Sequence, residues 1–297
     1  MKNINYFITL VLFMVILTNP GIIRAQEDTL SVKRLMLEGI EKMESGNEKA
    51  AIEMFDRGRE MLHKIAVKKD ERNINIIRSS EITRKAEKEI QKGNFEDALV
   101  LLNEAIEYND RNIEAYKFRG SVRLVLEERI ERKRNRDYSS LLNDYTNAIR
   151  ITERSINDTP RNSQERKELE KEMAKILINR AFVKMQSGRR SGFNSAIDDY
   201  TLAIRYNDQN WDGFLGRAVA YNNIKDYRKE VQDYLKAIEL IEKYDFRLTD
   251  EEWSKMFLNV AMAYTNLRQD MLAHEYATKS YNLGNLDAEK IMERTRP

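Results

Sequence analysis

The sequence has no cysteine and very little proline or glycine, and these absences narrow the folds open to it. Its 297 residues include 3 Pro and 11 Gly, so turn signals are few and a multi-stranded β fold is disfavoured. Without cysteine, packing alone must hold the fold, and no lipidated cysteine can anchor the chain. Charged residues make up 34% of the chain and hydrophobic residues 41%, which disfavours both a polytopic membrane protein and disorder. A mostly helical soluble protein is expected.

The first 25 residues have the pattern of a secretory signal peptide. Lys2 precedes an almost unbroken apolar run over residues 6–18, and Asn-Pro-Gly breaks this run before Ala25 at the expected cut. A helix of this run would be roughly 20 Å long, short of the roughly 30 Å hydrocarbon core, so an uncleaved anchor is the weaker interpretation. We expect export to the periplasm or cell envelope, with secretion as an alternative. The leader resembles Gram-negative leaders, those of the Bacteroidetes in particular.

The charge of the mature chain is balanced. Removal of residues 1–25 takes away Lys2 and Arg24 and leaves 49 basic and 49 acidic side chains. Such a chain gives no indication of a nucleic-acid-binding surface. Nucleic acid is therefore not an expected partner, and contact with a membrane is expected only indirectly or through an uncleaved signal.

A pattern of paired amphipathic helices repeats along the rest of the chain. In the unit that begins at Trp211, Phe214, Ala218 and Tyr221 lie at i, i+4 and i+7, which places them on one face of a helix. The turn at Asp226 follows, and residues 231–241 carry a second apolar face. The sequence therefore predicts antiparallel helix pairs.

This frame resembles the tetratricopeptide repeat (TPR) family, whose units are about 34 residues long. It recurs in units near residues 32–65, 79–112, 113–155, 174–210, 211–244 and 254–287. The resemblance implies an all-α fold, an α-α superhelix (TPR solenoid) of about six helix-turn-helix repeats with a C-terminal capping helix. The proline that usually closes each unit is absent, so helices are expected to run past their usual ends.

Two interruptions divide the array. Residues 66–78 are charged and are expected to extend a helix, whereas residues 156–173 contain Pro160 and are expected to be a linker. The sequence thus predicts an N-terminal TPR block, 26–155, and a C-terminal block with the capping helix, 174–297. Within the linker, Asn162 is a candidate N-cap of the next helix.

The resemblance implies that the first helix of each repeat lines the inner curve of the solenoid. In three consecutive repeats, the positions next to the inter-helix contacts are apolar where polar residues are usual. These positions form the pairs Ile178 and Phe182, Leu215 and Val219, and Leu258 and Met262. Together they predict an apolar strip that binds an amphipathic helix or apolar peptide. The alternative is that superhelical curvature, or the chain's own terminal segment, buries them.

A basic segment within 125–136 is a second candidate contact. Its residues Arg132, Lys133 and Arg134 suit an acidic partner, anionic lipid head groups or a nucleic acid backbone. Neighbouring glutamates, Glu127 and Glu128 among them, favour a solvated insertion instead.

Catalytic and metal-binding patterns are missing from the sequence. The only histidines, His63 and His274, fall in the first and last repeats, so a two-histidine metal site is not expected. There is no glycine-rich phosphate loop and no nucleophile elbow. Acidic pairs such as Asp198 and Asp199 are interpreted as solvated and capping charges. No catalytic residue, metal or cofactor is expected, and the chain is not expected to be an enzyme.

These observations favour a non-enzymatic scaffold for protein–protein interactions in the bacterial cell envelope. The main alternative is a periplasmic, chaperone-like carrier of unfolded or exported client proteins. A polysaccharide-binding protein is a third, weaker hypothesis, because most of the 14 Tyr fall at repeat packing positions. The oligomeric state cannot be derived from the sequence, although an incompletely capped first repeat could dimerise.

Overall fold

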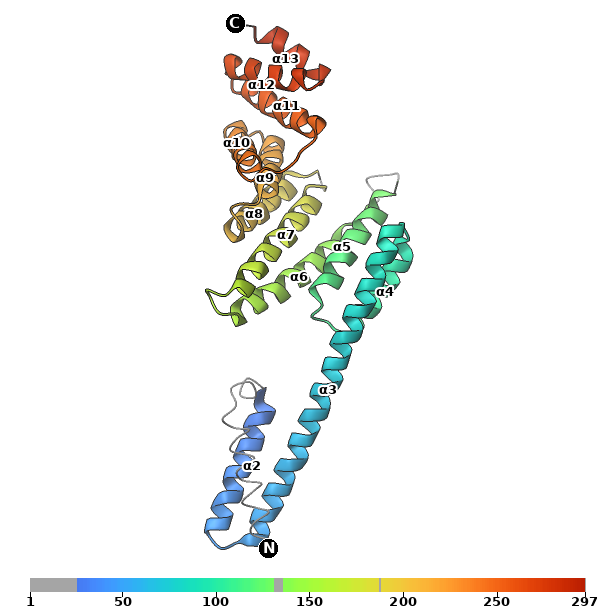
Figure 1. The fold of residues 1–297 in the computed structure, drawn as a ribbon, viewed down its shortest axis with the longest axis vertical. Coiled ribbons are helices and arrows are strands. Elements are labelled where there is room, and N and C mark those ends of the chain that lie inside the picture. The colour runs from blue at the N-terminus through green and yellow to red at the C-terminus, as the bar shows by residue number, and fades with distance from the viewer. Residues whose placement is uncertain (1–25, 131–135, 187, 297) are drawn as a thin grey trace. The chain divides into compact units, whose positions relative to one another are not determined.

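The computed structural model describes residues 26–130, 136–186 and 188–296. The expected signal peptide lies outside these residues. Every regular element within them is helical (Figure 1), and none of these helices combines the length and hydropathy needed to cross a bilayer. The elements are α2 (Gln26–Glu44), α3 (Glu48–Lys92), α4 (Phe95–Tyr108), α5 (Ile113–Glu128), α6 (Ser139–Asp158), α7 (Gln164–Gln186), α8 (Arg190–Tyr206), α9 (Trp211–Ile224), α10 (Tyr227–Lys243), α11 (Asp250–Asn266), α12 (Asp270–Asn282), the 3-10 turn η2 (Leu286–Ala288) and α13 (Glu289–Arg294).

The chain forms two compact units, and the division between Arg78 and Ser79 falls within α3. Residues 156–173, where the sequence indicates a linker, are mostly helical, because α6 ends at Asp158 and α7 begins at Gln164. The α6–α7 joint is also packed: Ile156 shares a buried cluster with residues 173–177. The residue that caps α7 is Ser163 rather than Asn162, because its Oγ accepts the Arg166 N–H at 3.1 Å.

The first unit is a helical hairpin built from α2 and the first part of α3. Its core is formed by Val32, Met36, Ala51 and Phe55. Gly39 allows the two helices to approach closely, because a Cβ at this position would lie 2.7 Å from the Phe55 ring. Residues 66–78 are helical throughout, which confirms the expected helical extension.

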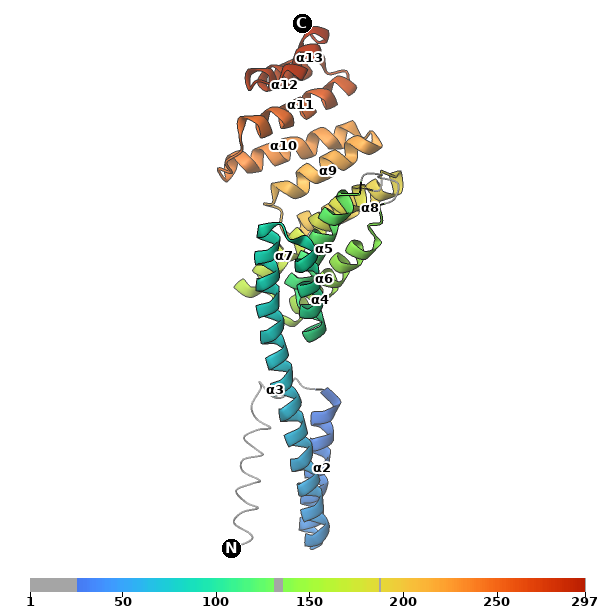
Figure 2. The same ribbon diagram turned by 90° about the vertical axis from the view of Figure 1, so that its right-hand side faces the viewer.

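The second unit is a stack of antiparallel helix pairs that follow the predicted repeat frame (Figure 2). The last part of α3 pairs with α4, and α5–α6, α7–α8, α9–α10 and α11–α12 are the following pairs. Small residues lie where the helices meet: a Cβ on Gly120 would lie 3.0 Å from the Tyr145 ring, and one on Gly216 2.4 Å from the Tyr200 ring. The predicted all-α class, an α-α superhelix of helix-turn-helix repeats, is confirmed.

The last helix pair is covered by η2 and α13. Ala288 of η2 shares a buried cluster with Ala261 of α11 and Ala277 of α12, and Ile291 and Met292 pack against it. The small side chains allow the short terminal elements to lie close to the pair. A capping element of this kind can present a polar outer surface and cover the apolar face of the last repeat, which would otherwise be open to solvent.

Candidate partner-binding surface

Three consecutive repeats contain the same buried ion pair. An arginine on the first helix binds an aspartate on the second helix through two nitrogens in the α7–α8 and α9–α10 pairs, at 2.7–2.8 Å. The three pairs are Arg119–Asp144, Arg180–Asp199 and Arg217–Asp233. Because the aspartates are buried, these carboxylates are structural and are not available to a ligand.

Each of these arginines also joins its repeat to the preceding one. The third nitrogen donates a hydrogen bond to a polar side chain on the preceding second helix, at 2.8–3.2 Å. The acceptors are Asn103, Thr146 and Thr201. We call this series of bonds the arginine ladder. It fixes neighbouring repeats in register.

Sequence reasoning missed the arginine ladder. Asp199, interpreted above as a solvated or capping charge, is buried and binds both Arg180 and Lys184, whereas its neighbour Asp198 is exposed. The error arose because the partner of Asp199 is Arg180, which lies 19 residues earlier on the preceding helix and becomes a neighbour only when the helices pair. The signal was present: in all three repeats the arginine precedes the small residue of the first helix, and the aspartate precedes the tyrosine of the second.

The ladder ends at the joint between α10 and α11. Val260 occupies the position of the arginine there, and Leu235 replaces the polar acceptor; the two belong to one apolar cluster. Aromatic rings pack nearby: Trp253 stacks on Phe257 at 5.4 Å, and Phe257 contacts Tyr276 at 6.0 Å between ring centroids. The last repeat is therefore held by apolar packing in place of the arginine.

The structure places the six residues of the predicted strip in two kinds of surroundings. Phe182 on α7 and Met262 on α11 are 45% and 46% exposed. The other four are half-buried: Ile178 packs against the α7–α8 core, Leu215 and Val219 against the cluster that contains Val260, and Leu258 against the terminal cluster. Both interpretations of the strip thus apply, each to different members.

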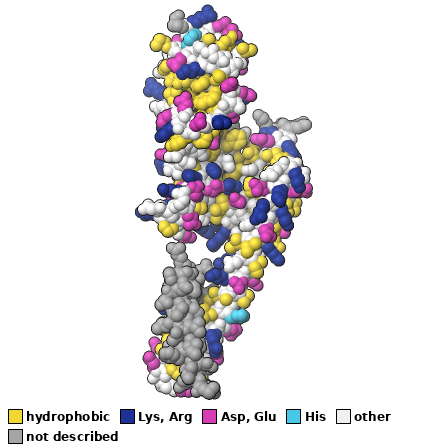
Figure 3. Space-filling model, in the orientation of Figure 1, with side chains coloured by type: hydrophobic (Ala, Val, Ile, Leu, Met, Phe, Trp, Pro, Cys, Tyr) yellow, Lys and Arg dark blue, Asp and Glu magenta, His cyan; other side chains and the backbone are white. Residues whose placement is uncertain are grey.

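Apolar side chains also gather on one face of the second unit. In Figure 3 they cover part of the second unit over the region of α9–α11, between rows of charged side chains. Of the first helices, α7 contacts α9 directly, whereas α9 and α11 both pack against α10. Phe182 and Met262, at the same repeat position on α7 and α11, therefore project from the same series of helices.

The predicted secondary contact, Arg132, Lys133 and Arg134, lies outside the described residues. The flanking residues are held in place: Arg129 pairs with Glu96 at 3.3 Å, and its guanidinium lies 4.9 Å from the centroid of the Phe95 ring. Arg136 donates hydrogen bonds to backbone carbonyls at the end of α5. The insertion is thus tied to α4 and α5 at both ends.

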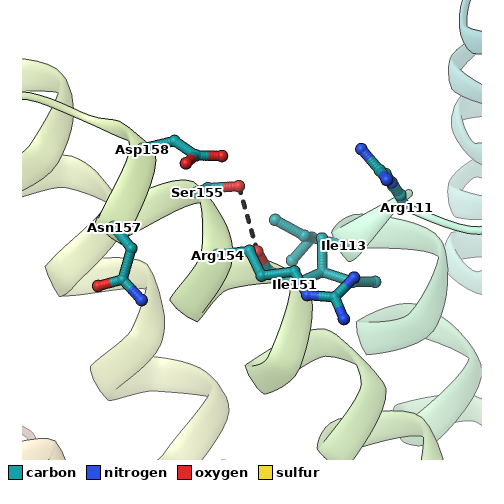
Figure 4. Close-up of a pocket in the computed structure, with 7 residues that line it drawn as sticks. All are labelled: Arg111, Ile113, Ile151, Arg154, Ser155, Asn157 and Asp158. Carbon is teal, nitrogen blue, oxygen red and sulfur yellow. Dashed lines mark hydrogen bonds between the residues drawn. The ribbon is translucent and has the colours of Figure 1, made fainter. Parts of the chain in front are cut away.

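A hollow of about 350 Å³ lies between the start of α5 and the end of α6 (Figure 4). Arg111 approaches it from the start of α5, Ile113 and Ile151 contribute apolar contacts, and Ser155 and Asp158 lie on the α6 side. The Ser155 hydroxyl donates a hydrogen bond to the Ile151 carbonyl at 3.2 Å. Charges of both signs lie around the rim.

Metal ligands do not cluster in the described part of the chain. No group of three or more His, Asp or Glu side chains there is placed to hold an ion. His274 contacts the Met292 carbonyl through Nδ1 at 3.2 Å, so it takes part in docking the terminal elements.

Comparison with known proteins identifies similar folds. No protein-family model and no curated protein matches the sequence. Similar solved structures include YrrB, described as a TPR protein with an unusual peptide-binding site, at 13% identity over 72% of this chain and 90% of that chain, with a TM-score of 0.46. MamA from Desulfovibrio magneticus RS-1 is 14% identical over 74% and 97% of the two chains, with a TM-score of 0.47. A thermophilic TPR protein of Thermus thermophilus is 15% identical over 73% and 98%, with a TM-score of 0.41. Likeness at this level carries no argument about function, and the fold rests on the helix pairs described above.

Proposed function

We propose that the chain is a non-enzymatic scaffold for protein–protein interactions, exported to the bacterial cell envelope, that binds a peptide or amphipathic helix along the first helices α7, α9 and α11. The observation that carries the proposal is the exposure of Phe182 and Met262 at the same repeat position on α7 and α11. Large apolar side chains exposed in register on one series of helices are typical of partner sites.

The surroundings of this surface suit binding rather than chemistry. The arginine ladder occupies the buried charges of three repeats, and its arginines bind protein side chains. Lys117, a further cation on a first helix, pairs with Glu172. An apolar contact therefore dominates the proposed site, with half-buried Ile178, Leu215 and Val219 between the two exposed residues. An amphipathic helix would fit by placing its apolar side against them.

Substitution of the two exposed residues tests the proposal. Phe182→Glu and Met262→Glu should each abolish recovery of the partner in a pulldown from native membranes, because a carboxylate would be desolvated in the complex. The melting temperature should change little, because both side chains already face solvent. Met271→Glu on α12 is the matched control, since Met271 is also exposed but lies on a second helix.

Two results would contradict this proposal. Unchanged partner recovery would show that the surface does not bind, and a large fall in melting temperature would assign Phe182 or Met262 to the core. The assay also separates a scaffold from a carrier of unfolded clients. A scaffold yields a stoichiometric complex with a defined partner, whereas a carrier suppresses the aggregation of many unrelated proteins.

A further inference from the structure

The outer face of α2 is apolar and uncovered by described residues. Val32 and Met36 point into the hairpin core, whereas Leu30 and Leu37 point away from it and are 61% and 52% exposed. Their separation of seven residues places both on one stripe of the helix, the spacing of helix-packing seams. The stripe lies in the first unit, so it is independent of the proposed partner site.

Charged residues around this stripe are ordered along the helix. A shallow hollow of about 530 Å³ on this face is lined by Leu30, Lys33, Arg34, Leu37, Glu38 and Glu41. The two basic residues precede Leu37, and the two acidic residues follow it. Among the described residues, none of these four charges forms an ion pair, although such pairs are common on α3.

We propose that this face binds the same face of a second copy of the chain, with the two α2 helices antiparallel and a two-fold axis passing near Leu37. Antiparallel pairing places Leu37 against its copy, whereas Leu30 lies outside this central contact, opposite the C-terminal end of α2 of the second copy. Lys33 and Arg34, about one turn before the axis, then face Glu41 of the second copy, about one turn after it. The two-fold axis repeats this contact on the other side.

The order of basic and acidic residues along α2 favours a second copy of the chain as the partner, and it favours the antiparallel direction over the parallel one. A parallel, in-register pair would place Arg34 against its copy and Glu41 against its copy, so like charges would repel. A uniformly acidic or basic partner would satisfy only half of the face. One helix face of this length buries less than the roughly 1,200 Å² of a standard stable interface, so the dimer should depend on protein concentration.

The absence of native cysteine allows a direct test. Leu37→Cys in the full chain should give a dimer with a short bifunctional maleimide, because the two copies of residue 37 meet at the axis. Leu30→Cys should not, because residue 30 and its copy would be separated by about 21 Å along the helices. Met271→Cys on α12, at an exposed site far along the chain, measures random cross-linking. Equal yields at all three positions, or none at position 37, would overturn the proposal.

Charge inversion provides a second test that does not depend on cross-linking. Reversal of the basic pair, Lys33→Glu with Arg34→Glu, should shift the dimer to monomer in a sedimentation-velocity concentration series, at unchanged helix content by circular dichroism. Adding Glu38→Lys and Glu41→Lys should restore the dimer, because the full inversion regains complementarity. Dimerisation that survives the double reversal, or that fails to return with the full inversion, would contradict the antiparallel arrangement.

Discussion

The buried ion pairs show how a single side chain can determine the register of a repeat. Arg217 binds both carboxylate oxygens of Asp233 and also the Thr201 hydroxyl, so one guanidinium connects three helices. A buried pair of this kind adds little net stability compared with apolar residues, but it strongly penalises the loss of one partner. The loss of stability arises because the charge of the remaining partner stays buried without a counter-charge.

Arg217→Ala should therefore destabilise the protein by about 3–5 kcal/mol, because the Asp233 carboxylate would stay buried without its cation. The double variant Arg217→Met with Asp233→Leu should recover most of this loss. Urea unfolding gives both values. Arg228→Ala, an exposed arginine on α10, should change stability by less than about 0.5 kcal/mol. If Arg217→Ala costs no more than this control, the pair does not have the role assigned to it.

The buried carboxyl of Glu230 should make the stability of the second unit depend on pH. Burial raises the pKa of its carboxyl to about 7, although Asn222 donates a hydrogen bond to Oε1 at 2.9 Å; Oε2 has no partner among the described residues. The folded state therefore holds this proton at pH values where the unfolded chain, with a glutamate pKa of about 4.3, has released it. As pH rises from about 4.5 to 7, this group lowers stability, by an amount on the order of 3 kcal/mol.

Glu230→Gln should remove that trend. The variant should be more stable than the parent protein at pH 8, and the difference should close as pH falls below the unfolded-state pKa of about 4.3, where Glu230 becomes protonated in both states. Thermal unfolding across this range measures the difference. Glu239→Gln, at an exposed position on the same helix, should show no such pH-dependent difference. A constant difference at every pH would mean that Glu230 does not titrate as proposed.

At the scale of helices, most of the second unit could be predicted from the sequence. The i, i+4, i+7 apolar spacing and the small residues at the inter-helix contacts gave the pairs, because both patterns follow directly from helix geometry. The start of α7 was predicted one residue early, with Asn162 as the N-cap where Ser163 caps the helix. Pro160 indicated a break, but the packing of Ile156 against residues 173–177 allows the helices to continue on both sides of a short loop.

The candidate site was predictable only in part, because burial between first helices depends on how closely they approach. Ile178 shows this dependence: its Cδ1 would be in ordinary van der Waals contact, at 3.8 Å, with a Cβ on Gly213, so the next first helix, α9, helps to cover it. Phe182, one turn further along, is exposed. The periodicity that identified both residues carries no information about the next repeat's backbone.

At the scale of the whole molecule, the two units have separate cores. The buried cluster of the first unit draws on α2 and on α3 no further than Ile65. The clusters of the second unit begin at Ile82 and continue through the helix pairs to Met292. Since repeat arrays are stabilised by contacts between neighbours, loss of one core need not propagate to the other.

Phe55→Ala should therefore unfold the first unit selectively. The truncation leaves a cavity against Gly39 and Met36 and should cost about 3–5 kcal/mol, a large share of what a core of this size can supply. Hydrogen exchange followed by mass spectrometry should show faster exchange over residues 30–65 and unchanged protection in α5–α12. Tyr145→Ala, in the core between α5 and α6, should produce the opposite distribution because its cluster lies wholly in the second unit. Faster exchange throughout the chain in either variant would mean that the two cores unfold as one, and the division at Ser79 would then have no thermodynamic meaning.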